Sequence, residues 1–284
     1  EWLWGGGGAD EAAAAHGRPE ASAPEELRAA PPPCDVASAL RALASLRTDP
    51  SWSCACEEET VAFFTRDDAD GAVEVAVEAK YDAPVASLLS LPREFDLLQG
   101  WNDFVQRSVI LHEPSLLSLR GYAELWMPPP LYPRSFLFDA EGHDLIDDDG
   151  CFLILVKDAD PSTPGIPESD ADCYRGRILP GTCVKLTPMP GERVVAHVHV
   201  RVDLQMLGVP GSMLQWLVWT VGPYVHGEMQ RLLLGLQEED NQYRKRIESN
   251  RALYGLVERR SAELCVRGGA AAEGADRPAE EKGG

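Results

Sequence analysis

Apolar residues near the start of the chain first recur at helical spacing and then alternate with polar ones. A short helix that Asp35 can cap is predicted by residues repeating every three or four positions, namely Val36, Leu40, Leu43 and Leu46. Two strands are expected next, over residues 52–65 and 72–81. In the second, valines alternate with charged side chains, so one face is predicted to be buried and the other solvated.

The middle of the chain favours two short helices and then a run of strands. The helices are expected within residues 83–110, with Leu97, Leu98, Trp101, Phe104 and Val105 in the second. A strand over 116–126 places Leu117, Leu119, Gly121, Ala123 and Leu125 on one face. Further strands are expected over 132–138, 151–157, 174–179, 183–187 and 193–202. The long loop over 158–172 is typical of a lid or a binding loop.

The last third predicts one long helix. Its apolar stripe runs through Leu214, Leu217, Val221, Val225, Met229, Leu232 and Leu236 and continues, thinner, through Tyr243, Ile247, Tyr254, Val257 and Leu264. Pro223 should kink or restart it. Prolines and glycines interrupt the apolar run at 206–225, which favours an amphipathic helix over a membrane span. The order of elements predicts an α+β fold, with a curved antiparallel sheet wrapped around the final helix.

Composition sets the domain boundaries and excludes some partners. Residues 1–33 and 267–284 are too poor in large apolar side chains to order, so one domain is expected over 34–266. A formal net charge of -20 argues against nucleic acid as a partner. Seven cysteines without a CxxC pair are expected to be reduced thiols, typical of a cytoplasmic protein.

Three stretches carry a resemblance to a known family. They are 85–104, which reads VASLLSLPREFDLLQGWNDF with Trp101 near its end, the proline-rich 128–134, and 203–210 followed by Met213–Trp219. Over residues 35–240 the chain resembles START (StAR-related lipid transfer) domains. Ser135 replaces the family's Asp, and Leu204 stands where a Pro is usual. The resemblance implies a helix-grip fold that binds one lipid or sterol non-covalently in a hydrophobic cavity, with transient membrane contact.

The apolar surface exceeds what one core needs, which points independently to a cavity. Strand 151–156 is apolar on both faces, and the final helix adds a wide apolar stripe. An empty void of roughly 400 Å³ would cost on the order of 10 kcal/mol, so a ligand or water must fill it. The alternative is a closely packed core without a tunnel. The residues expected to line the cavity are Trp101, Leu119, Ala123, Leu125, Arg134, Val198, Val200, Leu214, Leu217 and Val221.

Polar candidates leave other functions open. Arg134 could anchor a lipid headgroup or pair with a carboxylate. His197 and His199 share one face of a strand and are expected to point outward, and neither a metal nor a cofactor is predicted. Nucleophile and phosphate-loop motifs do not occur. Two alternatives to lipid binding remain: a cyclase-like enzyme using a pocket histidine such as His199, and a module that binds a protein through its C-terminal helix and the basic residues of 244–260.

Overall fold

The computed structural model describes residues 34–67, 72–128, 131–170, 172–205 and 211–275. The predicted N-terminal tail and residues 276–284 lie outside this part. In chain order the elements are α1 (Cys34–Ala44), β1 (Ser53–Glu57), β2 (Val61–Asp67), β3 (Val73–Tyr81), α2 (Val85–Arg93), the 3-10 helix η2 (Phe95–Gly100), β4 (Val105–Ser115), β5 (Ser118–Leu125), β6 (Arg134–Leu145), β7 (Cys151–Asp158), β8 (Tyr174–Arg175), β9 (Arg177–Ile178), β10 (Cys183–Met189), β11 (Arg193–Asp203), α3 (Gly211–Gly235), α4 (Gln242–Ser249) and α5 (Arg251–Ala275).

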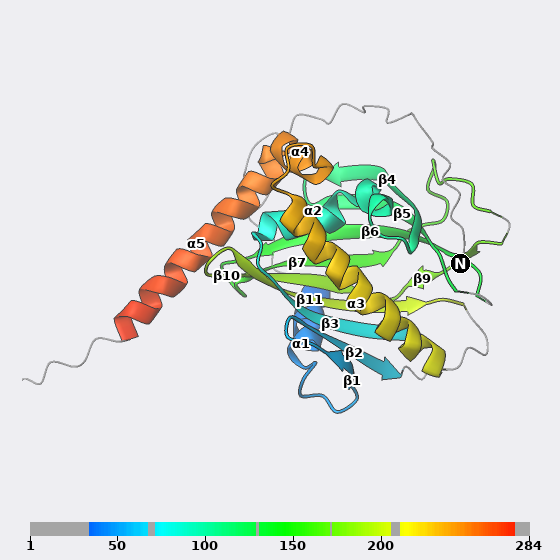
Figure 1. Ribbon diagram of the computed structural model, residues 1–284, viewed down its shortest axis with the longest axis horizontal. Helices are drawn as coiled ribbons and strands as arrows, with labels where there is room; N and C mark the ends of the chain where they lie inside the picture. Colours follow the sequence, from blue (N-terminus) through cyan, green and yellow to red (C-terminus); the bar gives the residue numbers. More distant parts are fainter. Residues whose placement is uncertain (1–33, 68–71, 129–130, 171, 206–210, 276–284) are drawn as a thin grey trace, which may run out of the picture.

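The strands form one curved, open sheet. Its order is β1-β2-β3-β11-β10-β7-β6-β5-β4, and all neighbours along this path are antiparallel. Strand β8 adds to β6 in parallel, and β9 adds to β11. The predicted curved antiparallel sheet with a helix across it is confirmed (Figure 1).

The two faces of the sheet are covered differently. The inner face carries α3, and the main core forms there from β2, β3, β10 and β11 together with α2, α3, α4 and α5. The outer face carries α1, whose Val36, Ala39 and Leu43 pack on alternate residues of the same strands. Strand β7 is therefore apolar on both sides, as the sequence of 151–156 indicated, whereas β3 and β11 carry Glu74 and His199 on the outer side.

Several predicted elements differ from the observed ones. The expected strand over 52–65 is two strands, β1 and β2, separated by a turn after Glu57. The expected second helix ends as η2 at Gly100, and Val105 instead begins β4. Three register shifts in the pairing of β4 with β5 break the two-residue alternation by which a strand is recognised.

The predicted long C-terminal helix is three helices. Pro223 lies inside α3, which runs unbroken from Gly211 to Gly235. A turn follows, and Asn241 then starts α4 by accepting hydrogen bonds on its side chain from the backbone N–H groups of Tyr243 and Arg244. Helix α5 runs past the expected boundary at 266 and projects from the body (Figure 1).

Candidate functional site

Most of the predicted cavity residues lie on the inner face. Leu119, Ala123 and Leu125 alternate along β5, and cross-strand pairing puts Leu125 opposite Arg134 of β6. Val198 and Val200 belong to the inner side of β11, since their neighbours Ala196 and Val194 pack into the main core. Val221 is partly buried on α3. The side chains of Leu214 and Leu217 lie outside the described part.

Helix α3 contacts residues near both edges of the sheet within one turn. At Gly222 it lies so close to β2 that an added Cβ would meet the ring of Phe63 at 2.6 Å. Two residues on, the Tyr224 hydroxyl donates to Asp103 at 2.6 Å, and its ring contacts Phe104 at a centroid distance of 5.5 Å. Asp103 and Phe104 immediately precede β4. Helix α3 therefore spans the concave side of the curved sheet from β2 to the start of β4.

Burial along β3 and β11 shows where the packing loosens. At one end of the paired strands, Ala79, Tyr81, Val194 and Ala196 are buried in the main core. Toward the other end, inner-face side chains stay partly accessible although strands flank them on both sides, namely Val73, Val75, Val77, Val198, Val200 and Val202. We call the first the closed end and the second the open end of the grip.

A chain of hydrogen bonds joins α3 to the sheet at the closed end. The His226 ring lies between the Tyr81 hydroxyl, 3.0 Å from Nδ1, and the Thr60 hydroxyl, 3.1 Å from Nε2. Gln230 donates to the Thr60 oxygen, and the Tyr81 hydroxyl donates to the sulfur of Met229. The Tyr81 oxygen therefore accepts a hydrogen bond from Nδ1–H, and Nε2 accepts a hydrogen bond from the Thr60 hydroxyl. Burial lowers the pKa of His226, against an opposing influence of Glu58.

His226 was missed because it sits one position off the predicted stripe. The stripe used Val225, whereas the buried residues of α3 include His226 and, two turns further on, Leu233. Spacing could have identified it, since Gly222, His226 and Leu233 share one helical face at intervals of four and seven.

Arg134 is buried and bound to the chain itself. Its Nε donates to the Leu204 carbonyl at 2.7 Å, and one terminal nitrogen donates to the carbonyls of Tyr132 and Pro133. Its guanidinium also lies over the Tyr174 ring. Of the two roles left open for Arg134, the contacts among the described residues therefore show neither a headgroup nor a carboxylate: the acceptors are backbone oxygens. Trp101 packs beside the main core, and its indole N–H donates to Tyr243 of α4 at 2.8 Å.

The paired histidines lie on the outer face, as expected. His199 is buried beneath α1, where its Nε2 is 2.7 Å from Glu74 and its ring meets Trp52 edge-on. Burial raises the pKa of Glu74, but hydrogen bonds from Arg66 and His199 outweigh it, so the net shift is downward. Cys183 pairs across the strands with His199, and burial raises the pKa of its thiol to about 12. That thiol stays protonated and is a poor nucleophile.

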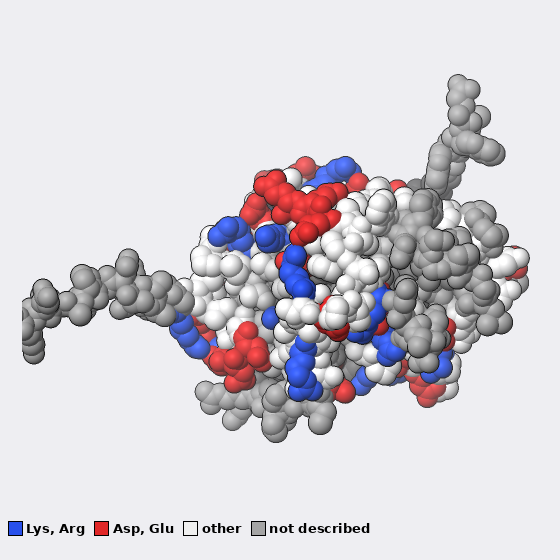
Figure 2. All heavy atoms as spheres, turned by 90° about the horizontal axis from the view of Figure 1, so that it is seen from below, with Lys and Arg blue, Asp and Glu red and all other residues white. Residues whose placement is uncertain are grey.

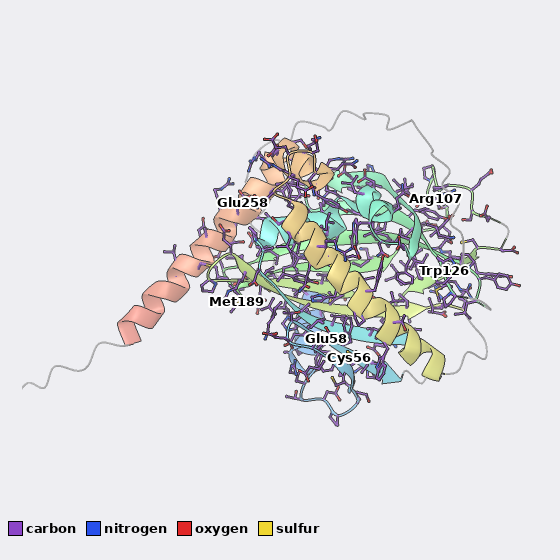
Figure 3. All side chains as sticks on the ribbon, viewed as in Figure 1. Cys56, Glu58, Arg107, Trp126, Met189 and Glu258 are labelled. Carbon is purple, nitrogen blue, oxygen red and sulfur yellow. The ribbon has the colours of Figure 1, made fainter. Side chains whose placement is uncertain are left out.

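Large aromatic side chains are exposed around the open end. Trp126 follows β5, while Tyr132 and Tyr174 flank the start of β6 with their rings 5.4 Å apart. Trp219 on α3 is 62% exposed. Figure 3 shows Trp126 and Met189 at opposite ends of the sheet. Among the helices of the described ranges, none is long and apolar enough to cross a membrane.

Comparison with solved structures identifies the fold. Human StAR-related lipid transfer protein 5 aligns with a TM-score of 0.59 at 15% identity, over 72% of this chain and 96% of its own. Human STARD10 aligns with a TM-score of 0.60 at 14% identity, over 77% of this chain and 86% of its own. A STAR-related lipid transfer protein from Xanthomonas axonopodis aligns with a TM-score of 0.50 at 16% identity, over 64% of this chain and 98% of its own. No family model and no curated protein matches the sequence. The predicted START-like helix grip is confirmed as a fold.

Proposed function

We propose that this protein binds one lipid or sterol, without covalent chemistry, between the inner face of its sheet and α3. The observation that carries the proposal is the double contact of α3 with Phe63 on one margin and Asp103 on the other. These contacts hold α3 across the inner face of the curved sheet, and the ligand is proposed to lie between the two. The partly accessible valines of β3 and β11 supply an apolar wall for an acyl chain or a sterol ring.

We further propose that the ligand is exchanged with membranes at the open end. The similar solved structures include proteins named for lipid transfer. Trp126, Tyr132, Tyr174 and Trp219 are exposed near that end, and amphipathic aromatic rings favour the membrane–water interface. Six free cysteines among the described residues support the cytoplasm as the compartment.

A non-catalytic role fits the polar groups better than the cyclase-like alternative. His199, the histidine first considered, lies on the far side of the sheet beneath α1. The histidine on the inner side is His226, which α3 itself carries toward the sheet, and both of its ring nitrogens already have partners. A general acid or base needs a ring nitrogen that can reach the substrate.

The protein-binding alternative meets a structural difficulty. Helices α4 and α5 contribute Tyr243, Leu253, Tyr254 and Val257 to the main core, so deletion after Asp240 would remove core side chains. Basic residues of this segment form ion pairs within the chain, for example Arg246 with Asp96 and Arg260 with Asp144. On the side seen in Figure 2, basic and acidic side chains are interspersed.

Native mass spectrometry of the purified protein after incubation with a lipid extract tests the binding proposal. We expect one bound lipid per chain. Val200→Phe should reduce occupancy at least fivefold because the ring fills the hollow, whereas Val195→Phe, on the opposite face of β11, should not. Lipid-free spectra at full sensitivity, or equal occupancy in both variants, would overturn the proposal.

A further inference from the structure

We infer that the outer face of the sheet holds a second binding site, for a small uncharged molecule with an apolar body and one carbonyl oxygen. The site is a cavity of about 210 Å³ between the sheet and the loop over residues 159–170. Tyr122, Ser135 and Leu137 form the wall on the sheet side. The length of the loop, as the sequence indicated, is typical of a binding loop.

Cross-strand pairing separates this cavity from the proposed lipid site. Tyr122 of β5 pairs with Leu137 of β6, whereas the inner-face residue Ala123 pairs with Phe136. Successive side chains of a strand point to opposite faces, so Tyr122 and Leu137 belong to the outer face. Helix α1 packs on the other half of that face, over β2, β3, β7 and β10. The two sites are therefore on opposite sides of the sheet.

Three arginines of the sheet hold the loop in place, so the cavity exists before a ligand binds. Each donates one hydrogen bond of 2.9 or 3.0 Å to the loop: Arg107 to the Glu168 carbonyl, Arg120 to the Thr163 hydroxyl, and Arg175 to the Ala159 carbonyl. Ala159 and Ile166 also pack with Tyr122 and Leu137 in a cluster separate from the main core. A site that is ordered in advance loses little conformational entropy on binding.

The Arg175 side chain on the wall has donors to spare. Its Nη2 donates to Asp158 and Ala159, while its Nη1 is not buried and has no acceptor among the described residues. The Tyr122 hydroxyl already donates to Glu124 and accepts from the Ser169 hydroxyl. A ligand that brings one oxygen acceptor to Nη1 therefore complements this wall.

The charges around the cavity disfavour an ionised ligand. The arginines that hold the loop are each paired with a carboxylate: Arg107 with Glu124, Arg120 with Asp139, and Arg175 with Asp158. The other charged residues of the loop and its flanks are all exposed, and they are Lys157, Asp160, Glu168, Asp170 and Asp172. This acidic surplus repels an anion, and a cation inside the cavity would meet the Arg175 guanidinium.

The size and lining of the cavity limit the ligand to about one ring. Its volume of about 210 Å³ is below the roughly 300–1,000 Å³ of pockets that take drug-sized molecules. Leu137, Pro161 and Ile166 supply apolar surface against which a ring can pack. A molecule of this size makes few contacts, so we expect a dissociation constant in the millimolar range.

Three probes of nearly equal size test the class of ligand. Benzamide is uncharged and carries a carbonyl, benzoate is an anion, and benzylamine is a cation. Each is titrated into the full chain, and binding is followed by ligand-observed NMR. We expect benzamide to bind at least tenfold more tightly than either ion. No binding of benzamide in the millimolar range, or equal binding of the three probes, would overturn the inference.

A matched pair of loop variants tests the place of binding. Ile166→Trp fills the cavity from the loop side and should weaken benzamide binding at least tenfold. Ser162→Trp adds the same ring at an exposed position of the loop that does not line the cavity, and it should bind as the parent does. Equal affinities of the two variants contradict the site. Benzamide that is displaced when the chain is loaded with cholesterol binds on the inner face, which also overturns the inference. If Ile166→Trp does not fold, the three probes and the displacement test with the parent chain still decide.

Discussion

At the scale of single residues, His226 couples α3 to the sheet through an uncharged ring. Its Nδ1 proton and its Nε2 lone pair are both used, by Tyr81 and Thr60. A second proton on the ring would need an acceptor that Thr60 can supply only by redirecting its own hydroxyl. Burial also disfavours the charged ring and lowers its pKa, although Glu58 acts in the opposite direction. Both features oppose protonation of the folded state.

We therefore predict that acid weakens the folded protein through His226. The pKa of His226 is lower in the folded state than in the unfolded chain. Its contribution to the free energy of unfolding is therefore complete above the ordinary histidine pKa of about 6.5 and is lost as the pH falls below that value. The uptake of one proton changes the free energy of unfolding by at most about 1.4 kcal/mol per pH unit. Urea unfolding of the parent chain and of His226→Gln, between pH 5 and 7.5, measures it.

The control for this experiment is His112→Gln, on an exposed residue of β4. Burial also lowers the pKa of His197, so some pH dependence remains in every variant. The difference between the parent and His226→Gln isolates the residue in question. If that difference does not change with pH, His226 is not the group responsible.

At the scale of elements, a buried ion-pair cluster fixes α4 and α5 to the domain. Glu94, between α2 and η2, is fully buried at 0% exposure and accepts the Tyr254 hydroxyl of α5 at 2.7 Å. Arg246 of α4 bridges Glu94 and Asp96. The C-terminal helices therefore belong to the domain's core and are not an appended arm.

We predict that Tyr254→Phe destabilises the protein by about 2 kcal/mol, because it removes a hydrogen bond to a buried carboxylate. Tyr224→Phe is the matched control: it also removes a tyrosine–carboxylate bond, to Asp103, but an exposed one, and should cost about 0.5 kcal/mol. Urea unfolding of both variants makes the comparison. A Tyr254→Phe cost no larger than the control would mean that the cluster does not hold α5.

The same elements show how far the sequence predicted the structure. Strand β3, with strict alternation, and β5, with one apolar face, were predicted with the correct inner face. The outer face of β3 was wrongly expected to be solvated: α1 covers it and Glu74 and Ala76 are buried. Strand β4 was not, because its register shifts against β5 spoil the alternation. The break after α3 could have been predicted, since Asn241 is a favourable cap, but the apolar stripe continues across it. The hydrogen bond from Arg134 to the Leu204 carbonyl joins residues 70 positions apart and leaves no local pattern.

At the scale of the whole molecule, the two ends of the grip have different chemistry. The closed end is packed by α2, α4 and α5 and bound by polar clusters, whereas aromatic side chains are exposed toward the open end. A net charge of -20 repels anionic bilayers, so the membrane exchange proposed above would depend on insertion of aromatic rings. Under that proposal, the open end is the side that meets the bilayer.

We predict that Trp126→Ala slows lipid exchange with vesicles about five- to tenfold, because an interfacial tryptophan contributes on the order of 1 kcal/mol or more to docking. Met189→Ala is the control, since Met189 is equally exposed, at 39%, but lies at the opposite end of the sheet (Figure 3). Exchange should also be slower with phosphatidylserine vesicles than with phosphatidylcholine vesicles, and salt should narrow that gap by screening the charge. Lipid exchange followed by fluorescence transfer measures both effects. Equal rates for the two variants would assign docking to another surface, because an apolar side chain matters for docking only on the side that meets the bilayer.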